Sequence, residues 1–448
     1  MRLLSATLLL AWPLAAQGIS VPATVDTLEN GLRVIVHEDH SSPIVAVNTW
    51  YHVGSGSEKT GRTGFAHLFE HLMFMGSEHA PYPQFDRLLE AAGASNNGST
   101  TEDRTNYYEW GPKSSLDLML WLEADRMGGL LPPMDEAKVD AQRDIVKNER
   151  RQGLENVPYG KVSDVLPTLL YPAGHPYSWP VIGSMADLSA ASLDDVKDFF
   201  RTWYAPNNAV LVVAGDVDRS EVLSRARKYF GHIPRGAAIQ YPRPDQPTMA
   251  RDTLVNLEDR VGAARLYYAF PTTPAWSKDD AALNVAAYVL SGARNSRLDT
   301  RLIHRDESAS GVSASAGGQK LAGTLQIVAT AKPGGALSPL QQAIDDELRR
   351  LATEGPTDRE MQQARNAIES RFLGSIQTVL GKADQLNQYY FEIGQPDGFQ
   401  RDLDRIMAVS ADDVRRVVAQ YLTGPRVIVG VVPEGRLELG AVRREVTP

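Results

Sequence analysis

His67, Glu70 and His71 form a short stretch whose residue types and spacing could bind a metal ion and activate water. Positions i, i+3 and i+4 of a helix share one face, so a helix here places both imidazoles and the carboxylate side by side. Two histidines four residues apart can bind one zinc ion, while a neighbouring glutamate takes a proton from a water molecule. The spacing therefore predicts a metal-dependent peptidase site.

A catalytic zinc site normally has three protein ligands and keeps a fourth position for water. The chain contains no cysteine, so the third ligand must be a histidine or a carboxylate. Six residues are candidates: His79, His175, Glu102, Glu109, Glu123 and Glu149. Context favours Glu149, because it lies in a long amphipathic helix predicted over residues 135–152. Spacing alone leaves the other five open.

An internal repeat provides a control for this motif. Residues 192–213 align without gaps with residues 410–431, and in both copies a predicted helix leads into an apolar strand. Extending the alignment upstream, with a shift of two residues, pairs Gly76 with Gly292. Three apolar residues then stand opposite His67, Glu70 and His71: Leu283, Ala286 and Ala287. The second copy keeps a helix without ligands, so the fold itself does not require the two histidines.

Turn signals and apolar patterns predict the elements that position the motif. Asn30-Gly31 between two apolar runs predicts a tight hairpin within residues 25–38. Residues 44–53 and 210–214 are apolar enough for largely buried strands. Further helices are expected over residues 82–92, 115–127 and 194–204.

Residues 94–101 are small and polar, and residues 105–110 after them have strand character. A strand poor in large side chains leaves its backbone donors and acceptors open to an added peptide strand. The candidate substrate-binding residues are Asn96, Asn97, Gly98, Ser99 and Thr100. A plain surface loop is the alternative interpretation.

The pentapeptide at residues 67–71, followed far downstream by Asn148-Glu149-Arg150-Arg151, resembles the inverted zinc motif of the pitrilysin/insulinase peptidases. Flanking stretches agree with the resemblance: residues 54–58, 64–66, 74–77, 97–107, 175–177 and 179–183. The chain has the length of the short two-domain members, which include bacterial homologues of mitochondrial processing peptidase. The resemblance implies that His67, His71 and Glu149 bind one Zn²⁺ per chain and that Glu70 is the general base.

Two parts of the chain depart from the family pattern. Gln142 stands where the family usually has a glutamate; its amide can orient a ligand by hydrogen bonding but adds no negative charge. Ile303 and Ser310 stand where the family has an arginine and a tyrosine that bind substrate and stabilise the oxyanion. The missing pair is therefore expected from a homologous partner subunit that lacks the zinc motif. The alternative donors within the chain are Arg297, Arg301 and Arg305.

Length and composition indicate a globular protein of two domains. The chain has 448 residues, of which 43% are hydrophobic and 23% are charged. A proline-rich stretch, residues 233–249, is the predicted linker between an N-terminal zinc-binding domain (21–240) and a homologous non-catalytic domain (248–448). The repeat and the resemblance predict an α+β fold, each domain being a mostly antiparallel β-sheet packed with helices on one side.

The N-terminus carries Arg2, an apolar run over residues 3–14 and the small residues Ala15 and Ala16. This pattern is typical of a secretory signal peptide, predicted over residues 1–17, and implies a periplasmic or secreted protein. The apolar run is too short to span a bilayer and Pro13 interrupts it, so no stable membrane span is expected. The net charge of −9 argues against nucleic acid as a partner.

These features favour a zinc-dependent endopeptidase that cleaves peptides or unfolded protein segments as the catalytic subunit of a hetero-oligomer. The alternative is a non-catalytic scaffold subunit that binds peptides, for which Gln142, Ile303 and Ser310 give some weight. Such subunits commonly lose zinc ligands, whereas all three are present here. A weaker alternative is metal sequestration, which needs neither a placed base nor an edge strand.

Overall fold

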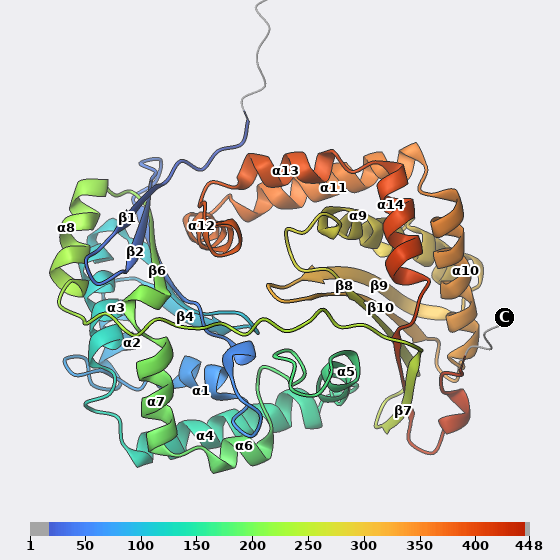
Figure 1. Cartoon of the computed structure of the whole chain (residues 1–448), viewed down its shortest axis with the longest axis horizontal. Helices are drawn as coiled ribbons and strands as arrows, with labels where there is room; N and C mark the ends of the chain where they lie inside the picture. The colour runs from blue at the N-terminus through green and yellow to red at the C-terminus, as the bar shows by residue number, and fades with distance from the viewer. Residues whose placement is uncertain (1–17, 444–448) are drawn as a thin grey trace, which may run out of the picture.

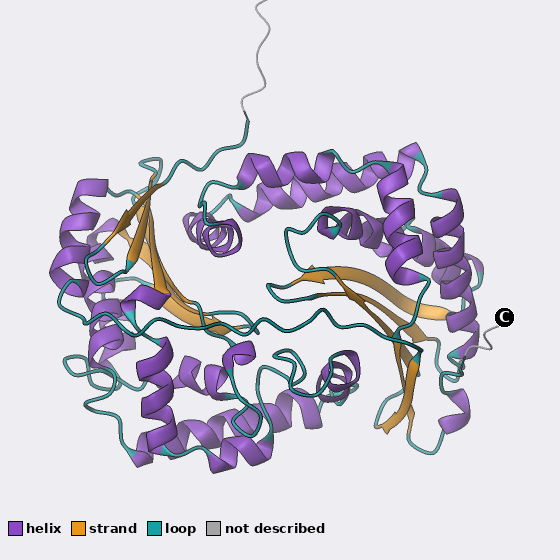
Figure 2. Cartoon of the chain, viewed as in Figure 1, coloured by secondary structure: helices purple, strands orange, loops and turns teal. Residues whose placement is uncertain are grey.

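Two β-sheets, one in each half of the sequence, organise the chain (Figure 1, Figure 2). The computed structural model describes residues 18–443, so the predicted signal peptide lies outside the described residues. The first sheet has the order β1-β2-β6-β3-β5-β4 and contains β1 (Thr24–Thr27), β2 (Arg33–Glu38), β3 (Ile44–Tyr51), β4 (Ser95–Thr100), β5 (Thr105–Pro112) and β6 (Ala209–Gly215). The second has the order β7-β11-β8-β10-β9 and contains β7 (Thr253–Asp259), β8 (Arg265–Thr272), β9 (Ala309–Gly318), β10 (Gly323–Ala331) and β11 (Val427–Pro433).

Helices connect and cover these strands. Those of the first half are α1 (Phe65–Leu72), α2 (Gln84–Ala91), α3 (Leu116–Gly129), α4 (Glu136–Arg150), α5 (Val162–Leu170), α6 (Met185–Ala190), α7 (Leu193–Trp203) and α8 (Arg219–Phe230). Those of the second half are α9 (Asp280–Ser291), α10 (Ser338–Glu354), α11 (Asp358–Ser375), α12 (Val379–Ile393), α13 (Phe399–Met407) and α14 (Ala411–Val417). Shorter 3₁₀ or π turns are η1 (Ser55–Ser57), η2 (Lys113–Ser115), η3 (Arg151–Glu155), η4 (Pro206–Asn208), η5 (Asp299–Arg305), η6 (Val418–Leu422) and η7 (Leu437–Leu439). Among the described residues, no helix combines the length and the apolar character needed to cross a membrane.

The two sheets share one topology. β2 and β6 are parallel neighbours in the first sheet, as β7 and β11 are in the second. All other strand pairs are antiparallel, and β3, β5 and β4 follow in the same order as β8, β10 and β9. The structure therefore confirms the predicted α+β fold of two similar halves with mostly antiparallel sheets. The domain boundaries at residues 240 and 248 stay predictions.

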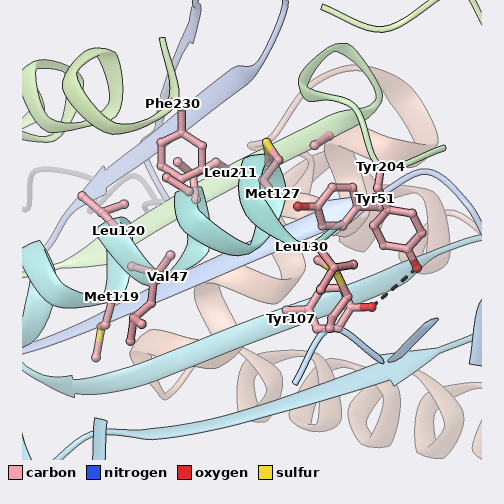
Figure 3. Close-up of a cluster of buried hydrophobic side chains, with 14 of the residues drawn as sticks. Val47, Tyr51, Tyr107, Met119, Leu120, Met127, Leu130, Tyr204, Leu211 and Phe230 are labelled. Atoms are coloured by element: carbon pink, nitrogen blue, oxygen red, sulfur yellow. Dashed lines mark hydrogen bonds between the residues drawn. The ribbon is translucent and has the colours of Figure 1, made fainter. Parts of the chain in front are cut away.

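Each sheet is covered on both faces. Val45 and Val47 of β3 pack into the main core of the first half, part of which Figure 3 shows, whereas Ala46 packs with α12. Helix α12 belongs to the second half of the sequence, yet it lies against β3 and β6 of the first sheet (Figure 1). Its counterpart α5 lies against β8 and β11 of the second sheet. Helices on one side of each sheet were predicted. The structure adds a helix on the opposite side of each sheet, and that helix comes from the other half of the chain.

Several predicted elements have direct counterparts in the structure. The hairpin at Asn30-Gly31 is formed by the antiparallel pair β1 and β2, and Gly31 has a φ of +91°, which favours glycine. The helix predicted over residues 135–152 is α4, which ends at Arg150 and continues as the π turn η3. Residues 234–249 form neither helix nor strand, as the proline content predicts.

Candidate metal centre

Helix α1 carries its two histidines and its glutamate on the face that points away from the core. The buried face of the helix consists of Phe65, Ala66, Leu68, Phe69 and Leu72. The side chains of His67 and His71 are 18% and 20% exposed, and their ring centroids lie 5.0 Å apart. The amphipathic pattern thus decides which side chains remain accessible to a ligand.

A buried carboxylate holds the first turn of α1. Glu58 accepts hydrogen bonds from the backbone N–H groups of Gly64 (2.9 Å) and Ala66 (2.8 Å). The first N–H groups of a helix have no partner inside it, and the two side-chain oxygens of Glu58 accept from them. Burial raises the pKa of Glu58 to about 8, although these hydrogen bonds act in the opposite direction. The sequence indicated Glu58 only as part of the flanking stretch at residues 54–58, and its contacts with α1 are visible in the structure alone.

Helix α4 brings Glu149 to the two histidines. Its Oε2 atom lies 3.3 Å from Nε2 of His71 and 3.8 Å from Nε2 of His67. One potential ligand atom from each residue lies within 4.8 Å of the other two, and this is the one such group found among the described residues. The three predicted ligands are therefore brought together.

The donor set fits a zinc ion. Tetrahedral zinc with ligands at 2.0–2.2 Å holds its ligand atoms about 3.3 to 3.6 Å apart, close to the separations from Glu149 to the two rings. Burial, reinforced by the nearby ring of His71, lowers the pKa of His67 to about 4. The imidazole of His67 is thus neutral at pH 7 and offers a lone pair to a metal ion.

The other five candidates for the third ligand lie elsewhere in the first half. His79 is paired with Asp125, Glu109 and Glu123 with Arg126, His175 with the backbone N–H of Tyr177, and Glu102 with Gln319. None of these five residues joins His67 and His71 in a group that could hold a metal ion, among the described residues. Of the six candidates, Glu149 is the one that the structure places beside the two histidines.

Glu70 lies beside the cluster and is held by the neighbouring strand. Its Oε2 atom accepts a hydrogen bond from the hydroxyl of Thr100, at 2.7 Å. Its other oxygen, Oε1, makes no hydrogen bond to any of the described residues. A carboxylate with one anchored and one open oxygen on the ligand-bearing face can serve as a general base.

Strand β4 is the edge of the first sheet, next to α1. One side of β4 pairs with β5, and the other side pairs with no strand among the described residues. The predicted substrate-binding residues make these contacts: Asn96 Nδ2 donates to Asp86, Asn97 Oδ1 accepts the N–H of Gly98, Ser99 Oγ donates to Asn106, and Thr100 donates to Glu70. The predicted open edge is present, but several of its side chains already have partners.

Gln142 is buried in α4, and its side-chain nitrogen lies 2.8 Å from the sulfur of Met75. Among the described residues it makes no hydrogen bond to His67, His71 or Glu149. Nδ1 of His67 is buried and has no hydrogen-bond partner among the described residues. The ligand-orienting contact that the sequence suggested for Gln142 is therefore not formed in this structure.

Ile303 and Ser310, at the family's arginine and tyrosine positions, contact residues of the second half of the chain. Ile303 packs against the core of the second half, and the hydroxyl of Ser310 donates to backbone carbonyls of β10 and its end. The three alternative arginines are also paired locally: Arg297 with Glu360, and Arg301 and Arg305 with Asp306. The structure thus identifies none of these five residues as a donor to the candidate metal centre.

Comparisons with known proteins point to one peptidase family. Residues 33–171 match the family model described as Insulinase (Peptidase family M16), and residues 190–368 match the model described as Peptidase M16 inactive domain. The zinc protease PqqE of Helicobacter pylori (strain ATCC 700392 / 26695) is 27% identical over 410 residues, covering 88% of this chain and 89% of that protein. The probable mitochondrial-processing peptidase subunit beta of Arabidopsis thaliana is 23% identical over 429 residues, covering 92% of this chain and 79% of that protein.

A solved structure agrees with these sequence matches. The crystal structure of a protease from Helicobacter pylori superposes with a TM-score of 0.86 at 25% identity, covering 93% of this chain and 100% of that one. The similarity therefore extends over both halves of the chain, including the second half, which carries no counterpart of the histidine motif.

Proposed function

Because the chain belongs to the M16 family of pitrilysin- and insulinase-type peptidases, we propose that it is a zinc-dependent endopeptidase that cleaves peptides or unfolded protein segments. The observation that carries the proposal is the convergence of His67, His71 and Glu149 at the face of α1 that also carries Glu70. Relatives that are named zinc proteases support a metal-dependent reaction. The unpaired edge of β4 beside the cluster supports a substrate bound in an extended conformation.

In this proposal His67, His71 and Glu149 hold one zinc ion, which when bound supplies a Lewis acid for the hydrolysis of a peptide bond. Glu70 is the general base. Its open oxygen, Oε1, takes a proton from the attacking water and later delivers it to the nitrogen of the leaving amine. Backbone pairing with β4 aligns the substrate so that its scissile carbonyl lies within reach of Glu70.

We also propose that the chain is the catalytic member of a hetero-oligomer. Ile303 and Ser310 cannot replace the arginine and tyrosine of the family, and the nearby arginines are paired within their own half. A homologous subunit without the zinc motif but with that pair would complete substrate binding and oxyanion stabilisation. The name of the Arabidopsis relative, a probable peptidase subunit, is consistent with such an assembly.

The test is a peptide-cleavage assay on the purified chain with zinc, alone and mixed with a homologous subunit of that kind. Glu70→Gln should abolish cleavage, because the amide cannot accept the proton of water. Glu90→Gln, at an exposed glutamate of α2, is the matched control. Full activity in Glu70→Gln contradicts the mechanism. Equal rates with and without the second subunit contradict the partner requirement instead.

A non-catalytic peptide-binding scaffold is the second candidate, because Gln142, Ile303 and Ser310 all differ from the family's functional residues. Metal analysis separates the two functions. One zinc per chain that disappears in His67→Ala supports the peptidase, whereas a chain purified with excess zinc that retains none supports the scaffold.

We further propose that the chain is exported and acts in the periplasm or outside the cell. The support is the leader-like pattern of residues 1–17 in the sequence. N-terminal sequencing of the protein recovered from a periplasmic or culture fraction should begin close to residue 17. A cytoplasmic protein that retains Met1 and Arg2 would contradict export.

A further inference from the structure

The hydroxyl of Thr100 donates a hydrogen bond to the carboxylate of Glu70. The Oγ1–Oε2 distance of 2.7 Å is typical of a hydrogen bond from a hydroxyl to a carboxyl oxygen. Because Thr100 ends strand β4, the residue that contacts the proposed base belongs to the strand proposed to pair with substrate. This contact differs from the substrate contact that the sequence predicted for Thr100.

Gly98 makes room for the same carboxylate. A Cβ atom on Gly98 would lie 3.2 Å from Cγ of Glu70, so the glutamate stem packs directly over the backbone of β4. Alternate residues of a strand share one face, which places Gly98 and Thr100 on the face that α1 covers. Gly98 therefore leaves space for the aliphatic part of the Glu70 side chain, and Thr100 hydrogen-bonds its carboxylate.

We propose that Thr100 is the positioning residue for the general base, an inference that rests on the proposed peptidase function. A glutamate side chain has several rotatable bonds, and a base must lie within hydrogen-bond reach of the proton that it removes. Thr100 holds Oε2 and leaves Oε1 open, so one carboxylate oxygen is directed toward water. Since the same strand aligns the substrate backbone, β4 sets the distance between base and scissile carbonyl.

The test is steady-state cleavage of an unstructured peptide by the full zinc-loaded chain, in complex with its partner subunit if cleavage requires one. Thr100→Val keeps the shape but removes the hydroxyl, and should lower kcat by about 10- to 100-fold, as expected for loss of a hydrogen bond to a charged group. KM should stay within about twofold of wild type, since the backbone of β4 is unchanged. Thr100→Ser should restore most of kcat, because serine keeps the hydroxyl. The matched control is Thr24→Val, an exposed threonine on β1 at the opposite edge of the sheet.

Two measurements separate positioning from structural damage. Thr100→Val should retain the wild-type zinc content, and its zinc-free form should bind a fluorescently labelled peptide as tightly as the zinc-free wild type. Unchanged kcat in Thr100→Val, with an active wild type, overturns the inference while the peptidase function stands. A raised KM with unchanged kcat also overturns it, by returning Thr100 to substrate binding. An inactive wild type with bound zinc contradicts the proposed function itself, and the inference falls with it.

Discussion

The candidate metal centre joins two largely buried imidazoles to a carboxylate that is 42% exposed. Burial keeps His67 neutral and therefore able to donate a lone pair. Glu149, near the C-terminal end of α4, is the most exposed of the three. A metal ion held there would keep an accessible position for water. Because Glu149 is more exposed than His67 and His71, its replacement should disturb folding least of the three.

Replacing Glu149 should weaken zinc binding without unfolding the chain. Glu149→Gln removes the only carboxylate of the proposed ligand set, and changes to groups that merely support a ligand already cost about 10- to 100-fold in affinity. We therefore expect a loss above about 100-fold in zinc affinity, measured by competition with a chelator. The zinc-free variant should melt within about 2 °C of wild type, since exposed substitutions change stability little. Glu136→Gln, exposed in the first turn of α4, is the control; equal affinities in all three proteins would exclude Glu149 as a ligand.

His52 should make stability fall in mild acid. Burial, followed by the charges of Lys320 and Arg33, lowers its pKa to about 3, well below the ordinary histidine value of about 6.5. Between these values the unfolded chain holds a proton that the folded chain does not, so the free energy of unfolding falls as pH falls, by at most about 1.4 kcal/mol per pH unit. Urea unfolding of wild type and His52→Phe between pH 4 and 7 measures the contribution of His52 to the pH dependence of the free energy of unfolding. The variant should show the shallower pH dependence, and identical slopes would contradict the assignment.

Side-chain spacing predicted that His67, Glu70 and His71 share one face of a helix, because positions i, i+3 and i+4 do so wherever that helix packs. The resemblance, rather than the spacing, pointed to Glu149. Thr100 required the structure: alternation shows which strand residues share a face, but not that α1 covers that face. For Gln142 the sequence suggested a ligand contact that the structure does not contain. Its amide lies against the sulfur of Met75 instead.

At the scale of elements, α12 is the least expected feature. Strand β6 is buried at every position, and its apolar run predicted a buried strand. The helix that covers its second face comes from residues more than a hundred and fifty positions away in the sequence. Local patterns cannot report such a contact, because periodicity describes only the face that an element buries and not its partner.

Shortening a core side chain of α12 should therefore destabilise the sheet of the other half. Leu386 is fully buried against that sheet, and Leu386→Ala should lower the free energy of unfolding by about 2–5 kcal/mol. Hydrogen exchange in β3 and β6 should become faster, because α12 packs on both strands. The control is Leu373→Ala at an exposed site of α11, where the expected change is about 0.5 kcal/mol or less. If hydrogen exchange became faster only in the second half, α12 would not be stabilising the sheet of the first half.

At the scale of the whole molecule, the halves also meet through equivalent hairpin turns. The turn between β4 and β5 contributes Asp103, which accepts the backbone N–H of Lys320 from the turn between β9 and β10, at 2.9 Å. The hydroxyl of Tyr177 donates to Asp103 and accepts the N–H of Leu321, at 3.0 Å. The repeat predicted two similar halves, but the contact between their turns depends on three-dimensional placement. This contact lies next to the edge strand proposed to bind substrate.

Removing the Tyr177 hydroxyl should loosen this junction. Tyr177→Phe leaves the N–H of Leu321 and one oxygen of Asp103 without that partner, which should cost about 1–3 kcal/mol of unfolding free energy. Hydrogen exchange followed by mass spectrometry should become faster at residues 101–104 and 318–322, and slower or equal exchange there would exclude the hydroxyl as a link between the halves. Tyr229→Phe is the control, because its hydroxyl donates to Asp117 within the first half. It should leave exchange at both turns unchanged, since the loss of a tyrosine hydroxyl matters here only where it joins the two halves.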